Sequence, residues 1–302
     1  MTATSTPLER PAGTADGDLR RRVLAGLPVT DRRVTVAGIP TAILEGGEGP
    51  PVILLHGPGE FAATWLRVIP ELVATHAVVA PDLPGHGASG MGDGDLGAQR
   101  VLRWLSELAE RTCSSPPALV GHGLGGALAA RFAALRPDRA RALVLVDSFG
   151  LAPLRPSPRF ALALVPFLVR PTEGTQRRLM QRCMADLDGL RATMGERLDT
   201  LEAYALDRAR HGEMSAAVRR LMRELGTPAI PAGELSRISA PTTLIWGRED
   251  LQVRLAVAEA ASARHGWPLH VIDGAADDPA VERPEEFMRA LGTALAIQKE
   301  IS

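Results

Sequence analysis

The sequence has almost no charge imbalance and few aromatic residues. Its 302 residues carry 34 Lys and Arg against 35 Asp and Glu, which gives a formal net charge of -1. A chain so close to neutral has no general electrostatic attraction for nucleic acid or for an anionic membrane. Aromatic residues make up 4% of the chain, too few for a base-stacking surface. We therefore expect neither nucleic acid nor a membrane as a partner.

Long apolar runs, metal-ligand spacings and disulfide patterns are also missing. The longest apolar stretch, residues 160–169, is interrupted by Pro166 and is too short to span a bilayer. Residues 1–20 lack the apolar core of a secretory signal. Cys113 and Cys183 fit no metal or disulfide spacing and suit a reducing compartment. These features predict a cytoplasmic globular protein with no metal and no other cofactor. Lys299 is the one lysine, an arginine bias typical of a GC-rich genome.

Short apolar runs alternate with helical patterns along most of the chain. Eight runs have the length of strands: 34–36, 41–44, 52–55, 77–80, 118–120, 143–146, 243–246 and 269–272. The first two flank a Gly-Ile-Pro turn and predict a hairpin, and the other six are typical of parallel strands buried on both faces. Helical patterns fall between them: 62–73, 95–111, 124–135, 253–263 and 284–297. A hairpin followed by repeated strand–helix units predicts an α/β fold with right-handed crossovers.

The alternation stops between Gly150 and Ser236. This stretch has no convincing strand, several amphipathic helical patterns and somewhat more arginines than acids. We interpret it as a helical cap, residues 150–235, over the edge of the sheet where open α/β sheets bind ligands. The core is then residues 25–149 and 236–302, and residues 1–24 are expected to be a flexible N-terminal segment.

Four segments carry a family resemblance. They are residues 55–59 (LHGPG), 81–89 (PDLPGHGAS), 121–126 (GHGLGG) and 246–250 (WGRED). Their order, and their places after successive strands, resemble the α/β-hydrolase fold family. The resemblance implies a mostly parallel eight-stranded sheet flanked by helices, with an inserted helical cap and a small-molecule ligand between core and cap.

The resemblance also implies a serine nucleophile and a histidine base, and both are replaced. The family's G-x-S-x-G turn reads Gly-His-Gly-Leu-Gly here, so Gly123 occupies the nucleophile position. The family's histidine precedes an E-x-P run, and here Asp277 stands in its place before Glu282-Arg283-Pro284. Glycine adopts positive φ freely, so its presence at the turn relieves strain and enlarges the space above it.

The acid and the oxyanion-hole positions are only partly kept. Asp250 retains the place of the family's acid. One oxyanion-hole donor is expected after the His-Gly of residues 56–57, where Pro58 has no N–H. The backbone N–H of Leu124 is the donor that remains. The expected ligand-binding residues are Pro58, Gly59, Glu60, Gly123, Leu124 and Asp147.

Asp250 and Asp277 are candidates for a catalytic pair, with His122 as a third candidate. In the family the acid and the histidine touch, so two carboxylates at these positions could share a proton and act as general acid and base. The alternative is that Asp277 lies in a solvated acidic loop with Asp278, and that Asp250 caps the helix after it. His122, next to Gly123, is a catalytic candidate or a loop anchor. Glu60 either enters the pocket or faces water.

Three classes of function follow from these replacements. The first is a non-hydrolytic enzyme that acts on a small, largely apolar molecule by acid/base or template catalysis, in an elimination, isomerisation or cyclisation. The second is a catalytically dead binding or scaffold protein. The third is a hydrolase with rearranged catalytic groups. The sequence favours the first, because catalytic residues are replaced within an intact frame, and it leaves the oligomeric state open.

Overall fold

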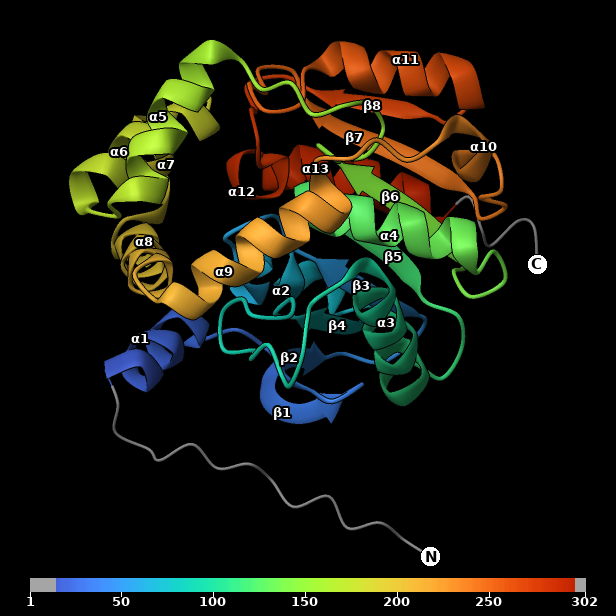
Figure 1. The fold of residues 1–302 in the computed structure, drawn as a ribbon, viewed down its shortest axis with the longest axis horizontal. Helices are drawn as coiled ribbons and strands as arrows, with labels where there is room; N and C mark the ends of the chain where they lie inside the picture. The colour runs from blue at the N-terminus through green and yellow to red at the C-terminus, as the bar shows by residue number, and fades with distance from the viewer. Residues whose placement is uncertain (1–14, 297–302) are drawn as a thin grey trace, which may run out of the picture.

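The computed structural model describes residues 15–296, and its centre is one eight-stranded sheet (Figure 1). The strands are β1 (Thr30–Val36), β2 (Ile39–Gly46), β3 (Pro51–Leu55), β4 (Ala77–Pro81), β5 (Ala118–His122), β6 (Ala142–Val146), β7 (Thr242–Gly247) and β8 (Leu269–Ile272). Their order in the sheet is β1-β2-β4-β3-β5-β6-β7-β8. The β1–β2 and β2–β4 pairs are antiparallel and the others are parallel. The predicted hairpin and the mostly parallel sheet are confirmed.

Helices cover both faces of the sheet. They are α1 (Ala15–Leu24), α2 (Ile69–Leu72), α3 (Ala98–Thr112), α4 (Gly123–Leu135), α5 (Pro158–Val169), α6 (Glu173–Cys183), α7 (Leu187–Met194), α8 (Glu196–Ala209), α9 (Gly212–Leu221), α10 (Ala232–Leu235), α11 (Leu255–His265), α12 (Pro279–Glu282) and α13 (Pro284–Ala296). A 3₁₀ turn spans Ala62–Arg67 and a π turn spans Met222–Gly226. Helix α13 begins at Pro284, as its fixed φ and the two following glutamates predict.

Two apolar clusters lie on opposite faces of the sheet. In β3, Ile53 and Leu55 pack with α3 and α4, whereas Val52 and Leu54 pack with the 3₁₀ turn and α13. Alternate side chains of one strand thus enter different clusters, and both sets are buried. This double burial explains why the central strands appear in the sequence as continuous apolar runs.

Along the chain, the segment between β6 and β7 contains helices and no strand. Helices α5 to α10 occupy this interval, and α5 to α8 form an arm at the left of Figure 1, beyond the sheet. This is the stretch we interpreted as a cap. Within residues 15–296, no helix is long and apolar enough to cross a membrane.

The expected flexible N-terminal segment does not extend over residues 15–24. These residues form α1, and Arg20 on that helix is buried. Its guanidinium pairs with Asp31 at 2.9 Å and with Asp82 at 2.7 Å. The Asp82 carboxylate also accepts the backbone N–H groups of Ala62 and Ala88. A buried cation paired to a carboxylate of the core holds this helix in place. The rest of the predicted segment, residues 1–14, lies outside the described residues.

Candidate active site

The turn between β5 and α4 positions the first candidate groups. β5 ends at His122 and α4 begins at Gly123, whose φ is +49°. The turn is tight because glycines allow close backbone approach: a Cβ on Gly125 would lie 2.3 Å from the carbonyl oxygen of Leu55. The side chain of His122 therefore lies at the end of a central strand, directly before Gly123, for which the family resemblance predicted the nucleophile position.

Gly123 leaves space bounded by the preceding loop. A Cβ added there would meet Pro58 Cδ at 3.3 Å and Phe149 Cζ at 3.7 Å. Gly59, on the same loop as Pro58, has open space where its Cβ would be. Leu124 is buried, and its N–H belongs to the first turn of α4, where N–H groups have no partner within the helix.

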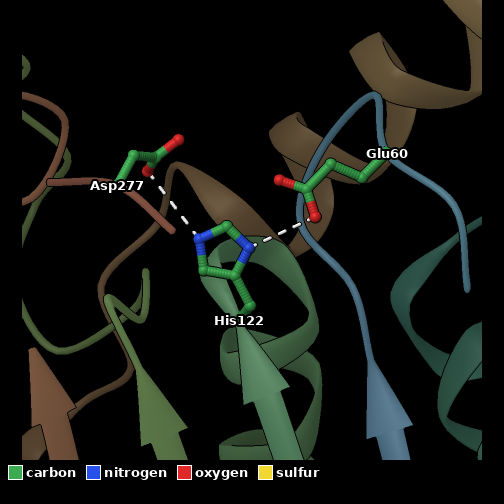
Figure 2. A group of neighbouring side chains, drawn as sticks. All are labelled: Glu60, His122 and Asp277. Carbon is green, nitrogen blue, oxygen red and sulfur yellow. Dashed lines mark hydrogen bonds and ion pairs between the residues drawn. The ribbon is translucent and has the colours of Figure 1, made fainter. Parts of the chain in front are cut away.

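The imidazole of His122 lies between two carboxylates (Figure 2). Its Nδ1 is 3.2 Å from Glu60 Oε2, and its Nε2 is 3.7 Å from Asp277 Oδ1. The side chain of His122 is only 3% exposed, against 21% for Glu60 and 10% for Asp277. Glu60 is held in turn by the N–H of Gly57, which donates to Oε2 at 2.7 Å. Glu60, His122 and Asp277 form the proton-transfer cluster.

Electrostatics favour a doubly protonated imidazole in this cluster. Burial lowers the pKa of His122, but Glu60 and Asp277 outweigh burial and raise it well above its usual value. The pKa of Glu60 is lowered: burial raises it, and the charge of His122 and its hydrogen bond more than compensate. Both shifts favour the imidazolium form of His122, with Nδ1–H directed to Glu60. Its Nε2 is buried, has no hydrogen-bond partner within residues 15–296, and faces Asp277 at more than hydrogen-bond distance.

The three side chains could also hold a metal ion. Their ligand atoms lie within 4.8 Å of one another, and one imidazole with two carboxylates is a set that divalent transition metals accept. However, each ring nitrogen faces a different carboxylate, an arrangement that suits an imidazolium with a proton on each nitrogen. The proton and a divalent cation are thus competing occupants of this cluster.

Asp250 and Asp277 lie in one buried region but are joined through a third residue. The carboxylate of Asp250 accepts the backbone N–H groups of Gln252 at 2.6 Å and Val253 at 3.0 Å. The side-chain amide of Gln252 donates to Asp277 Oδ2 at 2.5 Å. Burial and the charge of Asp277 raise the pKa of Asp250 well above its usual value. Gln252 was not among the predicted residues, although it stands two positions after Asp250.

The alternative interpretation of Asp277 and Asp250 was that Asp277 lies in a solvated loop and that Asp250 is a helix cap. Asp277 and Asp278 are 7% and 8% exposed, so the expectation of a solvated acidic loop is wrong. Burial raises the pKa of Asp278 to about 8. Asp250 does cap the backbone turn after it, but helix α11 begins only at Leu255.

Asp147 is a third buried carboxyl in this region. It ends β6 with a positive φ of 41°, rare for a residue with a side chain. Its Oδ1 accepts the N–H of Gly247 at 3.0 Å, and its Oδ2 has no partner within the described residues. Burial, with the neighbouring Asp250, raises its pKa well above the usual value. These effects favour the neutral form of Asp147, whose side chain connects the end of β6 to Gly247 at the end of β7.

The loop of Asp277 is fixed to the segment between α6 and α7. The N–H of Asp277 donates to the carbonyl of Cys183 at 3.0 Å. Glu282 accepts the N–H of Ala276 at 2.7 Å and the N–H of Ala185 at 2.6 Å. Burial raises the pKa of Glu282 to about 7. Glu282 also borders a hollow of about 360 Å³ between α7 and the start of α13, which none of the predicted site residues line.

Comparison with known proteins agrees with this architecture. The family model described as "Alpha/beta hydrolase family" matches residues 52–290, so the chain belongs to the α/β-hydrolase family. It is 29% identical over 283 residues to a 2-hydroxymuconate semialdehyde hydrolase of a Pseudomonas species, covering 89% of this chain and 95% of that protein. It is 28% identical over 264 residues to a pimeloyl-[acyl-carrier protein] methyl ester esterase of Chromobacterium violaceum, covering 83% of this chain and 96% of that protein.

Solved structures show the same fold. A membrane phospholipase A described as a bacterial virulence factor superposes with a TM-score of 0.79 at 26% identity, covering 94% of this chain and 91% of that chain. A putative lipase of Acinetobacter baumannii superposes with a TM-score of 0.78 at 21% identity, covering 97% and 99%. The family is enzymatic, and the relatives named here are hydrolases.

Proposed function

We propose that this protein is an α/β-hydrolase-fold enzyme that moves protons on a bound small, largely apolar molecule without a covalent intermediate at residue 123. The observation that carries the proposal is the buried Nε2 of His122, which makes no hydrogen bond within residues 15–296, lies 3.7 Å from the Asp277 carboxylate and is next to Gly123. A buried N–H that lacks a partner is available to a ligand oxygen, and an ionised partner makes that hydrogen bond stronger.

The cluster supplies both halves of an acid/base reaction. The imidazolium of His122 donates the Nε2 proton to a substrate oxygen, and the carboxylate of Asp277 accepts a proton from a substrate carbon or hydroxyl. Glu60 fixes the orientation of the ring through Nδ1 and stabilises its charge. An elimination, an isomerisation or a cyclisation needs only such a pair and a shaped pocket. In this proposal Glu60 is a positioning residue, whereas the sequence predicted that it contacts the ligand.

The test begins with a search for a transformed compound. Pools of small hydroxy, keto and carboxylic metabolites are incubated with the native protein and followed by mass spectrometry. A fluorophosphonate probe that targets activated serines is applied in parallel. We expect a transformed compound and no labelling, because residue 123 has no side chain.

The matched variants are His122→Gln and His270→Gln, the latter in the edge strand β8. Loss of a general acid lowers kcat by about 10²- to 10⁴-fold, so His122→Gln should lose activity and His270→Gln should keep it. Labelling of any residue by the probe would restore the serine-hydrolase interpretation. If compounds bind but are recovered unchanged, the protein is a binding protein and not the proposed enzyme.

Hydrolysis by a directly attacking water is the second candidate. It is favoured by the relatives, which are named as hydrolases, and by the space above Gly123. In this reaction Asp277 takes the proton of the water and His122 donates one to the leaving oxygen or carbon. Turnover in ¹⁸O-labelled water separates the two candidates, because only hydrolysis places the label in the product.

A further inference from the structure

Helix α5 exposes an apolar face to solvent. Leu162 and Val169 are 77% and 80% exposed, and Val165 and Leu168 are 57% and 59% exposed. Their spacing of three and four residues places them along one side of the helix. Within residues 15–296, only one other large apolar side chain, Leu135, is as exposed. Such a concentration of exposed apolar groups on one helix marks an interaction surface.

The segment that contains this face is rich in arginine and poor in acidic residues. Residues 150–183 contain one acidic residue, Glu173, and six arginines, all exposed: Arg155, Arg159, Arg170, Arg177, Arg178 and Arg182. None of the six has an acidic partner in the part of the chain that the structure describes. Helices α5 and α6 pack against each other in the outer arm at the left of Figure 1. The apolar face and the exposed arginines therefore belong to the same pair of packed helices and their flanking segments, hereafter the patch.

The charge of the patch selects its partner. A symmetric contact between two copies of this chain would bring the same patch together with itself, and its excess of five positive charges would oppose that contact. A bilayer with anionic lipids offers apolar depth for the leucines and valines and phosphates for the arginines.

We propose that helix α5 and the exposed arginines of residues 150–183 bind the surface of an anionic lipid bilayer. The helix lies in the plane of the interface, where its 12 residues extend about 18 Å, with Leu162, Val165 and Val169 toward the acyl chains. This differs from the expectation of no membrane partner. That expectation followed from the net charge of the whole chain, which averages out the local excess of arginine.

The patch is linked to the candidate active site. The N–H of Ser157, the residue that caps α5, donates to the carbonyl of Leu251 at 2.8 Å. Leu251 lies between Asp250 and Gln252, and the Gln252 side chain holds Asp277. Binding of α5 to a bilayer would therefore place this end of the molecule, and the loop behind it, next to the lipid phase.

Sedimentation with lipid vesicles tests the proposal. The full chain is mixed with vesicles of phosphatidylcholine alone, or of phosphatidylcholine with about one-third phosphatidylglycerol, at low and at high salt. We expect binding only to the anionic vesicles at low salt. At about 1 kcal/mol per arginine near the surface, Arg177→Glu/Arg178→Glu should weaken binding at least roughly 30-fold, because two attractions are lost and two repulsions are added. Leu162→Glu/Val165→Glu should weaken it at least about tenfold.

Two controls match these variants in chemistry. Leu135→Glu replaces the exposed leucine of α4, and Arg264→Glu/Arg289→Glu reverses the same number of charges on α11 and α13. Both should bind as the native chain does. Absence of binding to anionic vesicles, or an equal loss in the controls, would overturn the proposal. Light scattering could also overturn it. If the native chain is a dimer and Leu162→Glu/Val165→Glu is a monomer, the patch joins two copies of the chain.

Discussion

Replacement of Glu60 by Gln tests the electrostatics of the proton-transfer cluster directly. The substitution keeps the size of the side chain and an oxygen that can accept the N–H of Gly57, but it removes the charge 3.2 Å from His122 Nδ1. The substitution is therefore designed to remove the attraction between the Glu60 carboxylate and the His122 imidazolium.

The magnitude follows from the geometry. At 3.2 Å and an effective dielectric constant of about 20, two unit charges attract by about 5 kcal/mol. The cost of burying the carboxylate offsets part of this, so we expect Glu60→Gln to lower the free energy of unfolding by about 2–3 kcal/mol. With an unfolding entropy of about 2.1 cal/mol/K per residue, Tm should fall by roughly 3–5 °C.

The loss should depend on pH in both directions. The pKa of His122 is raised on folding, so its contribution is full below its unfolded value and is lost as pH rises through the folded value. The pKa of Glu60 is lowered on folding, so its contribution is present above its unfolded value and is lost as pH falls through the folded value. The difference between native and variant is therefore largest between these limits and vanishes at both extremes.

Calorimetry across pH and the NMR titration of the His122 Cε1–H signal measure these effects. The titration midpoint of His122 should fall in Glu60→Gln and stay unchanged in Glu48→Gln, which alters an exposed carboxylate. A stability difference that is constant across pH, or an unmoved His122 titration, would refute the pairing of these two charges.

Three further predictions concern the turn, the metal and α1. Gly123→Ala should lower stability by about 1 kcal/mol in urea unfolding, because φ is +49° and the new Cβ would lie 3.3 Å from Pro58; a more stable variant would show that the backbone is unstrained. If protons occupy the proton-transfer cluster, neither added Zn²⁺ nor a chelator should change Tm or activity. A rise in Tm with Zn²⁺ that is absent in His122→Gln would instead show that the cluster binds a metal. Arg20→Ala leaves the buried carboxylate of Asp82 without its cation, although the N–H groups of Ala62 and Ala88 still donate to it. Chemical unfolding should therefore show a loss of about 3–5 kcal/mol, and a loss below 1 kcal/mol would contradict the anchoring of α1.

The sequence predicted the fold well because its signals are local. Continuous apolar runs mark strands buried on both faces, and Pro284 marks the start of α13 in the sequence as in the structure. Helix α1 was missed because its stability depends on a distant partner. Arg20 pairs with Asp82, 62 residues away, and no property of residues 15–24 alone indicates that contact.

The sequence predicted which residues lie in the candidate site better than it predicted which of them contact each other. The family template brings the positions of Asp250 and Asp277 together, and both are buried there. The two carboxyl groups are connected through Gln252, whose backbone N–H donates to Asp250 and whose side-chain amide donates to Asp277. The contact of Glu60 with His122 joins two loops at the ends of different strands, and only the strand order of the sheet determines that they meet.

The packing around Gly123 bears on how easily the turn between β5 and α4 could accept the serine of the family's G-x-S-x-G motif. A serine there would need a strained backbone and would meet Pro58 at 3.3 Å, while the base would still be absent at Asp277. A histidine at 277 alone would replace a carboxylate that faces His122, so it would cost the cluster its charge balance and restore no nucleophile. Each single step is unfavourable by itself. A variant that tests whether this turn can carry a serine nucleophile therefore needs the serine at position 123 and the histidine at position 277 together.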